Sequence, residues 1–416
     1  MKRFIIILIG LFTASVFGQH TITLQECYEL AIKNHPLAQQ TALLETQSKL
    51  DAAVISTAKL PQINLDAQAT YQSDVIEVPI PNSTIEALNK DQYRATLSVN
   101  QLIYNGGITK AALQLKSAEL KTKQKQVEVH LYQLKQQINQ LYFSVLLAQE
   151  SELLLNSKQS LIQAKLHEVR SGIQYGLILP SSDNVLQAEL LKIDQQFQEL
   201  RSNKSVLVET LSQLIKKSLT GSTLFKKPLL ETQLKTNLTR PELEWFQFRK
   251  EEIKNSEKLI ASQNAPKLLG FATGGYGNPG LNMLDNSFQT FYTVGIKLSW
   301  NVFDWNSNKK QQQSLAINNE IIESEAKNFI LNTSIELNKY DYEIGKIEGF
   351  IVSDLEIITL RKEVLKSADS QLKNGVITSS AYVTELTNLY EDENNLIQHK
   401  TQLQLAKANY NVIKGH

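Results

Sequence analysis

Two short motifs in this chain of 416 residues could support chemistry at a serine hydroxyl. Ser56-Thr57-Ala58-Lys59 has the spacing at which a lysine amine can activate a serine for attack on an acyl group. Ser182-Asp183-Asn184 would supply a second hydroxyl and an amide to such a site. The serine-to-lysine spacing recurs at Ser324–Lys327 and Ser370–Lys373, however, and no Lys-Thr-Gly motif follows. The motifs are therefore weak indications of acyl-transfer chemistry.

An enzyme would also need elements that hold these motifs around one pocket. A penicillin-recognising serine hydrolase does so in an α/β core, whereas Ser182-Asp183-Asn184 lies between two long helical patterns. The 6 histidines are scattered without zinc spacing, and the 2 methionines and 1 cysteine form no soft-metal path or disulfide framework. We predict no catalytic residue, no cofactor and no metal site. A penicillin-recognising serine hydrolase stays an alternative, and a β-lactam hydrolysis assay would test it.

The N-terminus has the pattern of a secretory signal peptide. Lys2 and Arg3 precede an apolar run over residues 4–12, and small residues near Gly18 fit cleavage there. Cys27 lies too far beyond that point for lipid attachment, so we expect no lipidation. The net charge of +1 lacks the basic excess of nucleic-acid binders. No later apolar stretch reaches the ~20 residues of a spanning helix, so any membrane insertion must use strands.

The chain repeats one structural unit. Leu60-Pro61 recurs as Ala265-Pro266, and Asn34-His35-Pro36 recurs as Thr239-Arg240-Pro241 at the same spacing. Such a fixed register indicates duplication of a unit that reads helix, strand, loop, strand, long helix, turn, helix. The predicted segments are a signal peptide at 1–18, a first repeat at 19–218, a linker or equatorial segment at 219–240 and a second repeat at 241–416.

Four segments alternate between polar and apolar residues, as strands of an outer-membrane barrel do. They are predicted at about 62–72, 92–102, 267–276 and 290–301, near the ~9–11 residues of a tilted spanning strand. The polar side, expected to face the barrel lumen, includes Asn64, Asp66, Gln68, Arg94, Thr96, Ser98 and Lys297. Aromatic girdles are expected from Tyr71, Tyr93, Tyr276 and Tyr292 beside the hairpin loops, and from Tyr104, Trp300, Phe303 and Trp305 at the opposite ends.

Alternation alone fits a soluble antiparallel sheet with one solvent-exposed face equally well. The signal peptide and the aromatic girdles favour the membrane. Four strands are too few to close a barrel, and an open sheet would leave unpaired edges in lipid. Several copies of the chain must therefore share one barrel, which requires a homo-oligomer in outer-membrane lipid without fixing its number.

The remaining segments are predicted as unusually long helices. Heptad patterns without proline cover about 107–174 and 306–374, and return helices follow at about 180–216 and 379–413. At 1.5 Å per residue, the longer ones would extend about 100 Å, which suits a tube that stands away from a membrane. A soluble periplasmic coiled-coil structural protein is the alternative. It explains the helices but not the strands.

Several motifs in order resemble TolC-type outer membrane factors. Residues 22–27 with Ala31-Ile32-Lys33-Asn34-His35-Pro36 resemble the opening helix of that family. Gln101-Leu102-Ile103-Tyr104-Asn105-Gly106-Gly107 is similar to its strand-to-helix junction. Tyr175-Gly176 followed by residues 183–188 resembles its periplasmic turn, and Asn374-Gly375-Val376 is the second copy.

The resemblance implies a homotrimer in which an all-α coiled-coil barrel continues a shared twelve-stranded transmembrane β-barrel. It implies the exit duct of a tripartite efflux pump or a type I secretion system in the cell outer membrane, with a long periplasmic extension. The implied partners are a periplasmic adaptor (membrane fusion protein) and an inner-membrane transporter. The implied adaptor-docking tip comprises Arg170, Tyr175, Gly176, Leu177, Ile178, Asn374, Gly375, Val376 and Ile377. The implied periplasmic aperture comprises Ser182, Asp183, Asn184, Ser380, Tyr382 and Glu385.

Overall fold

The computed structural model describes residues 21–77, 86–232 and 237–416. The expected signal peptide and its cleavage site near Gly18 lie outside the described residues. The chain forms two compact units, which we call the hairpin unit and the sheet unit. The hairpin unit comprises the residues up to Ala38, His130–Arg240 and Ile330–His416, and the sheet unit comprises Gln39–Val129 and Pro241–Phe329.

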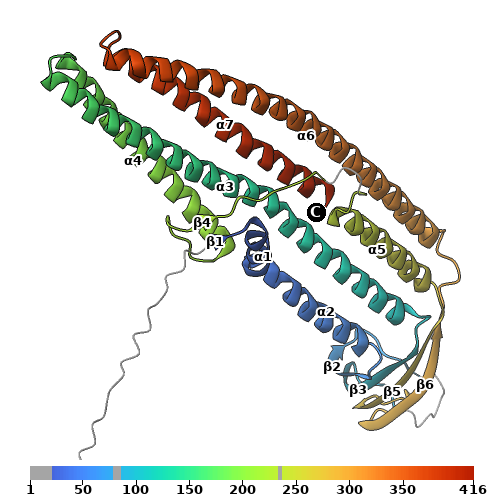
Figure 1. Ribbon diagram of the computed structural model, residues 1–416. Helices are drawn as coiled ribbons and strands as arrows, with labels where there is room; N and C mark the ends of the chain where they lie inside the picture. Colours follow the sequence, from blue (N-terminus) through green and yellow to red (C-terminus); the bar gives the residue numbers. More distant parts are fainter. Residues whose placement is uncertain (1–20, 78–85, 233–236) are drawn as a thin grey trace, which may run out of the picture. The chain divides into compact units, whose positions relative to one another are not determined.

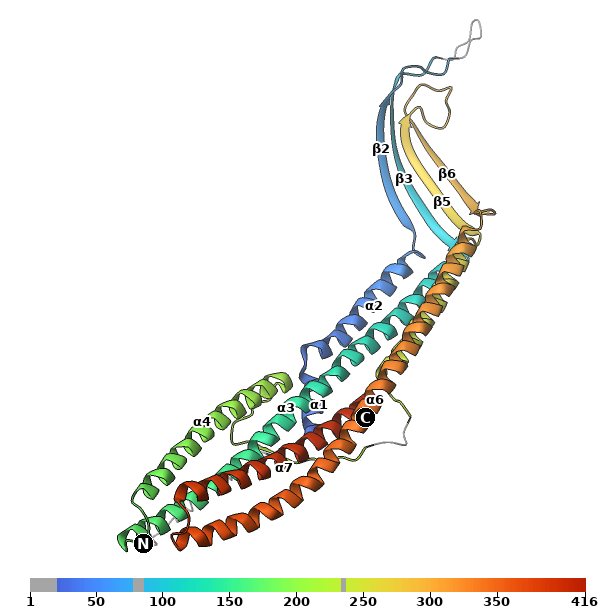
Figure 2. The same cartoon turned by 90° about the horizontal axis from the view of Figure 1, so that it is seen from above.

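The sheet unit holds four strands and two short helices (Figures 1 and 2). Its elements are α2 (Gln40–Thr57), β2 (Gln62–Tyr71), β3 (Asp91–Tyr104), α5 (Pro241–Gln263), β5 (Lys267–Asn278) and β6 (Gln289–Ser299). The two longest helices, α3 (Ile108–Gln174) and α6 (Ser307–Lys373), begin here and continue into the hairpin unit. The strands pair antiparallel in the order β2-β3-β5-β6.

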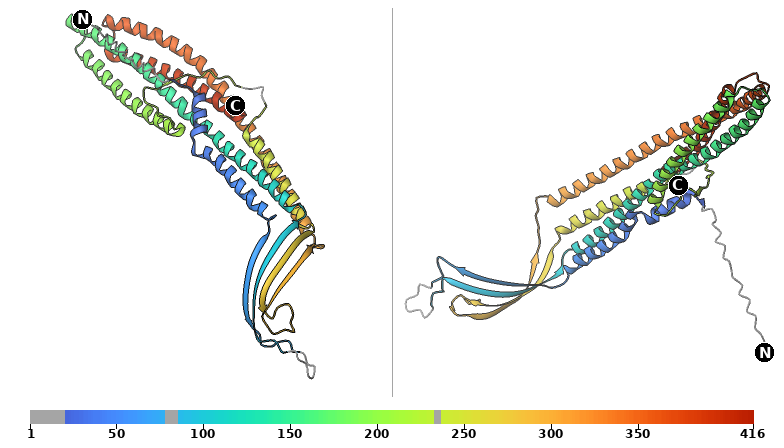
Figure 3. Two further views of the ribbon diagram at one scale, coloured as in Figure 1. Left: turned by 90° about the horizontal axis from the view of Figure 1, so that it is seen from below. Right: turned by 90° about the vertical axis from the view of Figure 1, so that its left-hand side faces the viewer.

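The hairpin unit holds the return helices α4 (Ser181–Ile215) and α7 (Ser379–Lys414). Figure 3 shows α4 running back along α3, and α7 running back along α6. Two strands of two residues each, β1 (Thr21–Ile22) and β4 (Leu224–Phe225), pair in parallel beside α1 (Leu24–Asn34). The predicted pair of repeats, each with two strands and long antiparallel helices, is confirmed.

The opening helix of the first repeat departs from the prediction, because it is broken. α1 ends at Asn34, a 3₁₀ turn covers Pro36–Gln39, and α2 starts at Gln40. Pro36 lacks an N–H group and disfavours helical backbone at the preceding residue, and His35 accordingly has ψ 140°. The matching Pro241 of the second repeat is the first residue of α5, where proline is tolerated.

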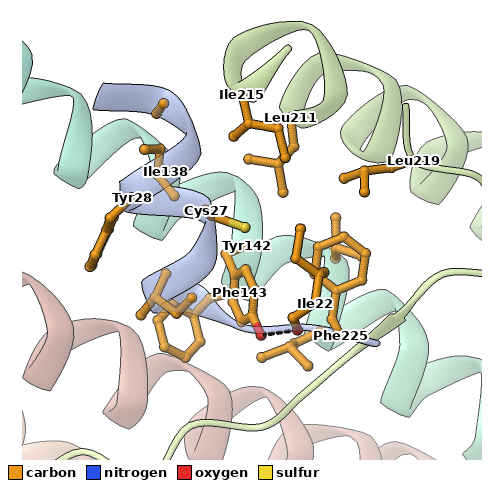
Figure 4. Packing of buried hydrophobic residues seen from close by; sticks show 14 of the residues in the cluster. Ile22, Cys27, Tyr28, Ile138, Tyr142, Phe143, Leu211, Ile215, Leu219 and Phe225 are labelled. Atoms are coloured by element: carbon orange, nitrogen blue, oxygen red, sulfur yellow. Dashed lines mark hydrogen bonds between the residues drawn. The ribbon is translucent and has the colours of Figure 1, made fainter. Parts of the chain in front are cut away.

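The main core of the hairpin unit gathers the start of the chain, α3, α4 and the segment after α4 (Figure 4). Tyr142 is fully buried there, and its hydroxyl donates to the carbonyl oxygens of Ile22 (3.0 Å) and Lys226 (2.6 Å). Phe225 is 3% exposed and packs edge-on against Tyr142. Part of the segment predicted as a linker at 219–240 therefore belongs to the core.

Cys27 lies in this core with no exposed surface, and burial raises the pKa of its thiol to about 12. Because the thiolate is the reactive form, native protein at pH 8 should not react with Ellman's reagent. Unfolding in guanidinium should release 1 thiol per chain, which serves as the positive control. Fast labelling of the native protein would contradict the buried position of α1.

No helix in the described part of the chain is long and apolar enough to cross a membrane.

Candidate functional site

The sheet has two chemically different faces. Directly paired residues of antiparallel strands point to the same side, so the strand register assigns every side chain to a face. Asn64 pairs with Ser98, Asp66 with Thr96, and Gln68 with Arg94. In the second repeat Lys297 pairs with Leu269, which in turn pairs with Leu102 on the same side as Arg94. All seven residues predicted for a lumen therefore share one face, which we call the polar face.

The opposite side, which we call the apolar face, exposes large aliphatic side chains. Leu65 is 76% exposed, Val294 72% and Ile296 70%. The apolar residues and glycines on this face are Ile63, Leu65, Ala67, Ala69, Tyr71, Tyr93, Ala95, Leu97, Val99, Tyr104, Leu268, Gly270, Ala272, Gly274, Tyr276, Tyr292, Val294, Ile296 and Leu298, and the polar residues Asp91, Gln101, Asn278 and Thr290 share it near the strand ends. A continuous exposed apolar surface of this kind is suited to contact with lipid or another protein.

Aromatic side chains gather near both ends of the sheet. Tyr71, Tyr93, Tyr276 and Tyr292 all lie on the apolar face near the hairpin loops. At the other end the Trp300 Nε1–H donates to the Asn264 carbonyl oxygen at 3.1 Å, and the rings of Phe303 and Trp305 lie edge to face at 4.8 Å.

A β-bulge sets the orientation of Tyr104. The register of β3 against β5 shifts between Leu102 and Tyr104, so that Tyr104 pairs with Leu268. Leu268 lies on the apolar face, whereas uninterrupted alternation after Leu102 would have turned Tyr104 to the polar face. The bulge therefore places this aromatic ring with the apolar residues.

The outer strands of the sheet have one free edge each. Within the described chain, β2 pairs only with β3, and β6 pairs only with β5. These edges of 10 and 11 residues present unpaired backbone N–H and C=O groups. They can accept another strand.

The two long helices end in matching turns. Gly176 (φ +73°) and Gly375 (φ +68°) take the left-handed conformation that glycine tolerates best. Leu177 N–H donates to the Gly172 carbonyl at 2.9 Å, and Val376 N–H donates to the Gln371 carbonyl at 2.9 Å. This hydrogen-bond pattern is the Schellman motif, which ends a helix and turns the chain.

The residues predicted for the tip divide into exposed and packed side chains. Tyr175 is 80% exposed, Val376 71% and Leu177 68%. Ile178 and Ile377 are partly buried and pack against the buried cluster of α3, α4, α6 and α7, so their part in docking stays a prediction. Each follows its glycine by two residues, and the turn directs it back onto the helices. Arg170, Asn374 and the two glycines are exposed.

The residues predicted for an aperture also include both accessible and buried side chains. Asp183 lies in the first turn of α4 and accepts from the Arg170 Nε–H at 2.7 Å, while Asn184 and Ser380 are exposed. Glu385 forms an ion pair with Arg361 at 3.6 Å.

Ser182 (7% exposed) and Tyr382 (4%) are buried in the helix packing, and their part in an aperture stays a prediction. Tyr382 belongs to the apolar cluster, where burial raises the pKa of its hydroxyl to about 12. The helical periodicity places both side chains on the inner faces of α4 and α7.

Two buried lysines of α3 were missed in the sequence. Lys158 is 4% exposed, and its Nζ donates to the Glu189 carboxylate of α4 at 2.8 Å. Lys165 is 6% exposed and pairs with Asp369 of α6. The ammonium groups also lie over the rings of Tyr390 (4.8 Å) and Tyr382 (5.2 Å) of α7.

These lysines are seven residues apart in a helix whose neighbouring heptad positions are apolar. That spacing could have identified them as inward-facing residues that need partners. Lys165 connects the first repeat to the second with a charge-assisted hydrogen bond to Asp369, whereas Lys158 reaches the second repeat through the Tyr390 ring.

The serine motifs lie in different units of the chain. Ser56 lies in α2 of the sheet unit, where its hydroxyl donates to the Ala52 carbonyl at 2.8 Å. Ser182 is buried in the hairpin unit. Among the described residues, no group of three or more His, Cys, Asp or Glu side chains could hold a metal ion.

The architecture is a fold that solved outer-membrane channels share. The chain resembles the outer membrane protein VceC of Vibrio cholerae with a TM-score of 0.67 and 14% identity, over 94% of this chain and 96% of that chain. It resembles the outer membrane channel CmeC of Campylobacter jejuni with a TM-score of 0.63 and 14% identity, over 94% and 85%. It also resembles the open state of the Neisseria gonorrhoeae outer membrane channel MtrE, with a TM-score of 0.62 and 14% identity, over 94% of this chain and 89% of that chain. Comparison with curated protein sequences found no significant match.

A family model matches part of the sequence. Residues 27–215, most of the first repeat, match the family model described as Outer membrane efflux protein. These residues are assigned to the outer membrane efflux protein family, and the predicted resemblance to the TolC-type outer membrane factors is confirmed.

Proposed function

We propose that this protein is an outer-membrane exit duct of a tripartite efflux pump or a type I secretion system. The observation that carries the proposal is the two-faced sheet, with an exposed apolar face, a polar face and a free edge on each side. An apolar face can contact lipid while the polar face lines water, as in outer-membrane barrels. The family match and the shared fold support the same function.

The barrel would be closed by three copies of the chain. In each copy the free edges of β2 and β6 need partners, because unpaired backbone groups are costly in lipid. Pairing β6 of one copy with β2 of the next would close a ring with no free edge. The four strands of each copy would then give the twelve-stranded barrel of the fold class. The seven predicted polar residues would face its lumen, and the aromatic residues would lie at the two interfaces.

The turns after α3 and α6 are the proposed contact for a periplasmic adaptor, which would connect the duct to an inner-membrane transporter. Tyr175, Leu177 and Val376 offer exposed apolar surface there, and Gly176 and Gly375 allow close backbone approach. Export through a signal peptide cleaved near Gly18, without lipidation, fits this location. The channel requires no catalytic residue.

Planar-bilayer recording tests the function directly. Protein purified in detergent should give discrete single-channel conductance, and native mass spectrometry should give the mass of three mature chains. A monomer without conductance would overturn the proposal and leave the strands as a soluble sheet. A mature chain that begins near residue 19 without a lipid mass would support the proposed processing.

A charge on the apolar face should block insertion. Ile296→Lys puts an ammonium group among the proposed lipid contacts, which costs about 2–4 kcal/mol at the bilayer midplane. We expect a large loss of trimer from urea-washed outer membranes. Thr293→Lys is the matched control, because Thr293 lies on the polar face of the same strand and the change adds the same group. Equal amounts of both variants in the membrane would contradict the assignment of the two faces.

A further inference from the structure

The charges on the polar face are unbalanced. Along the four strands this face carries one acid, Asp66, and three basic residues: Arg94, Lys267 and Lys297. Among the ion pairs of the described part of the chain, none involves any of these four residues. Each copy therefore brings a net excess of two positive charges to this face.

The two lysines lie close to each other near the helix end of the sheet. Lys267 pairs with Ser299, and Lys297 pairs with Leu269, so the two lysines are diagonal neighbours on adjacent strands. Diagonal neighbours on one face are about 7–8 Å apart. Two like charges on residues this close repel each other, and an anion bound between them would reduce that repulsion.

Arg94 is held in place near the other end. Its guanidinium lies over the ring of Phe291 with its central carbon 5.6 Å from the ring centroid. Arg94 is on β3 and Phe291 is on β6, so the side chain reaches across the whole width of β5. A side chain fixed in this way loses less freedom when it binds a solute.

Two glycines of β5 make this reach possible. Gly277 pairs with Arg94, and a Cβ atom there would lie 2.6 Å from the Tyr93 carbonyl oxygen and 3.3 Å from the Arg94 Cβ. Gly275 pairs with Phe291, and a Cβ atom there would lie 2.5 Å from its ring. These two glycines leave a shallow groove on the polar face, because a side chain at either position would fill it. Arg94 and Phe291 occupy it from opposite sides.

We propose that the polar face of the sheet is a basic lining that favours anionic solutes, with Arg94, braced on Phe291, and the pair Lys267 and Lys297 as its selectivity residues. The inference rests on the proposed function, because the polar face must line the lumen. In three copies the excess becomes six positive charges around one lumen. A lining of one sign between low-dielectric walls concentrates counter-ions.

Acidic residues of the strand connections, such as Asp74, Glu77 and Asp285, lie beyond the ends of the strands. Charges at the mouth of a channel face bulk water on more sides than charges between the low-dielectric walls of the lumen. They should therefore influence ion preference less than charges inside the lumen.

The test is the reversal potential of the reconstituted channel in a potassium chloride gradient at low salt. The wild type should pass chloride in preference to potassium. The double variant Arg94→Gln with Lys297→Gln should shift the chloride-to-potassium permeability ratio about two- to fivefold toward potassium, because each charge acts through water at short range. Asp66→Asn should shift the ratio the opposite way. Raising the salt to 1 M should weaken the preference, since the screening length falls to about 3 Å.

The control is Lys192→Gln, which removes the same charge from an exposed side chain of α4 in the hairpin unit. It should leave the ratio unchanged. A wild-type channel that prefers potassium, or a ratio that the luminal substitutions do not move, would overturn this inference while the channel function stands. Absence of any conductance in the wild type would instead contradict the proposed function.

Discussion

Replacing Lys158 by alanine should destabilise the protein by about 3–5 kcal/mol, because it leaves the carboxylate of a buried ion pair without its partner. Lys158 and Glu189 have side chains that are 4% and 10% exposed, and their charged atoms are 2.8 Å apart. The substitution also removes the ammonium group from the face of the Tyr390 ring. The midpoint of guanidinium unfolding, followed by far-UV circular dichroism in detergent, measures the loss.

Lys192 provides a matched control for this prediction, since it approaches the same Glu189 at 3.8 Å but is 71% exposed. Lys192→Ala should change stability by about 0–1 kcal/mol, the usual value of a surface ion pair. The double variant Lys158→Met with Glu189→Leu should recover most of the loss, because an apolar pair of similar volume needs no partner. Equal effects of the two alanine variants would mean that Lys158 is not buried in the folded protein.

Tyr142→Ala should lower the free energy of unfolding by about 3–5 kcal/mol, because it opens a cavity in the centre of the main core of the hairpin unit. The ring is fully buried and contacts Phe143 and Phe225 edge to face. Its hydroxyl joins the start of the chain to the segment after α4 through the carbonyls of Ile22 and Lys226. Loss of α1 docking should follow, and it would be detected as new reactivity of Cys27 toward Ellman's reagent.

Tyr142→Phe separates the two contributions, since it keeps the ring and removes only the hydroxyl. We expect a smaller loss of about 1–3 kcal/mol from the buried carbonyl left without its donor. Tyr175 is 80% exposed, so Tyr175→Ala should change the free energy of unfolding by no more than about 0.5 kcal/mol. An alanine variant at Tyr142 that unfolds at the wild-type midpoint would contradict the packing of this core.

The candidate site could be predicted in part. Strand alternation placed seven polar residues on one face, and the strand register brings those seven together. The resemblance implied the two turns after the long helices, and each turn has a glycine in the left-handed conformation that ends a helix. The burial of Ser182 and Tyr382 was not predicted, because motif order along the chain does not say which side of a helix faces its neighbours.

The sequence by itself determined the elements whose cause is local. Period-two alternation, proline-free heptads and a repeated register depend on residues that are near one another in the chain, so they can be interpreted without a fold. The tertiary structure decided what depends on contacts between distant residues. It turned Tyr104 to the apolar face through a bulge, drew Phe225 of the expected linker into the core, and matched buried Lys158 to Glu189. It also brought Arg94 across β5 to Phe291, because two glycines there leave room that no local pattern reveals.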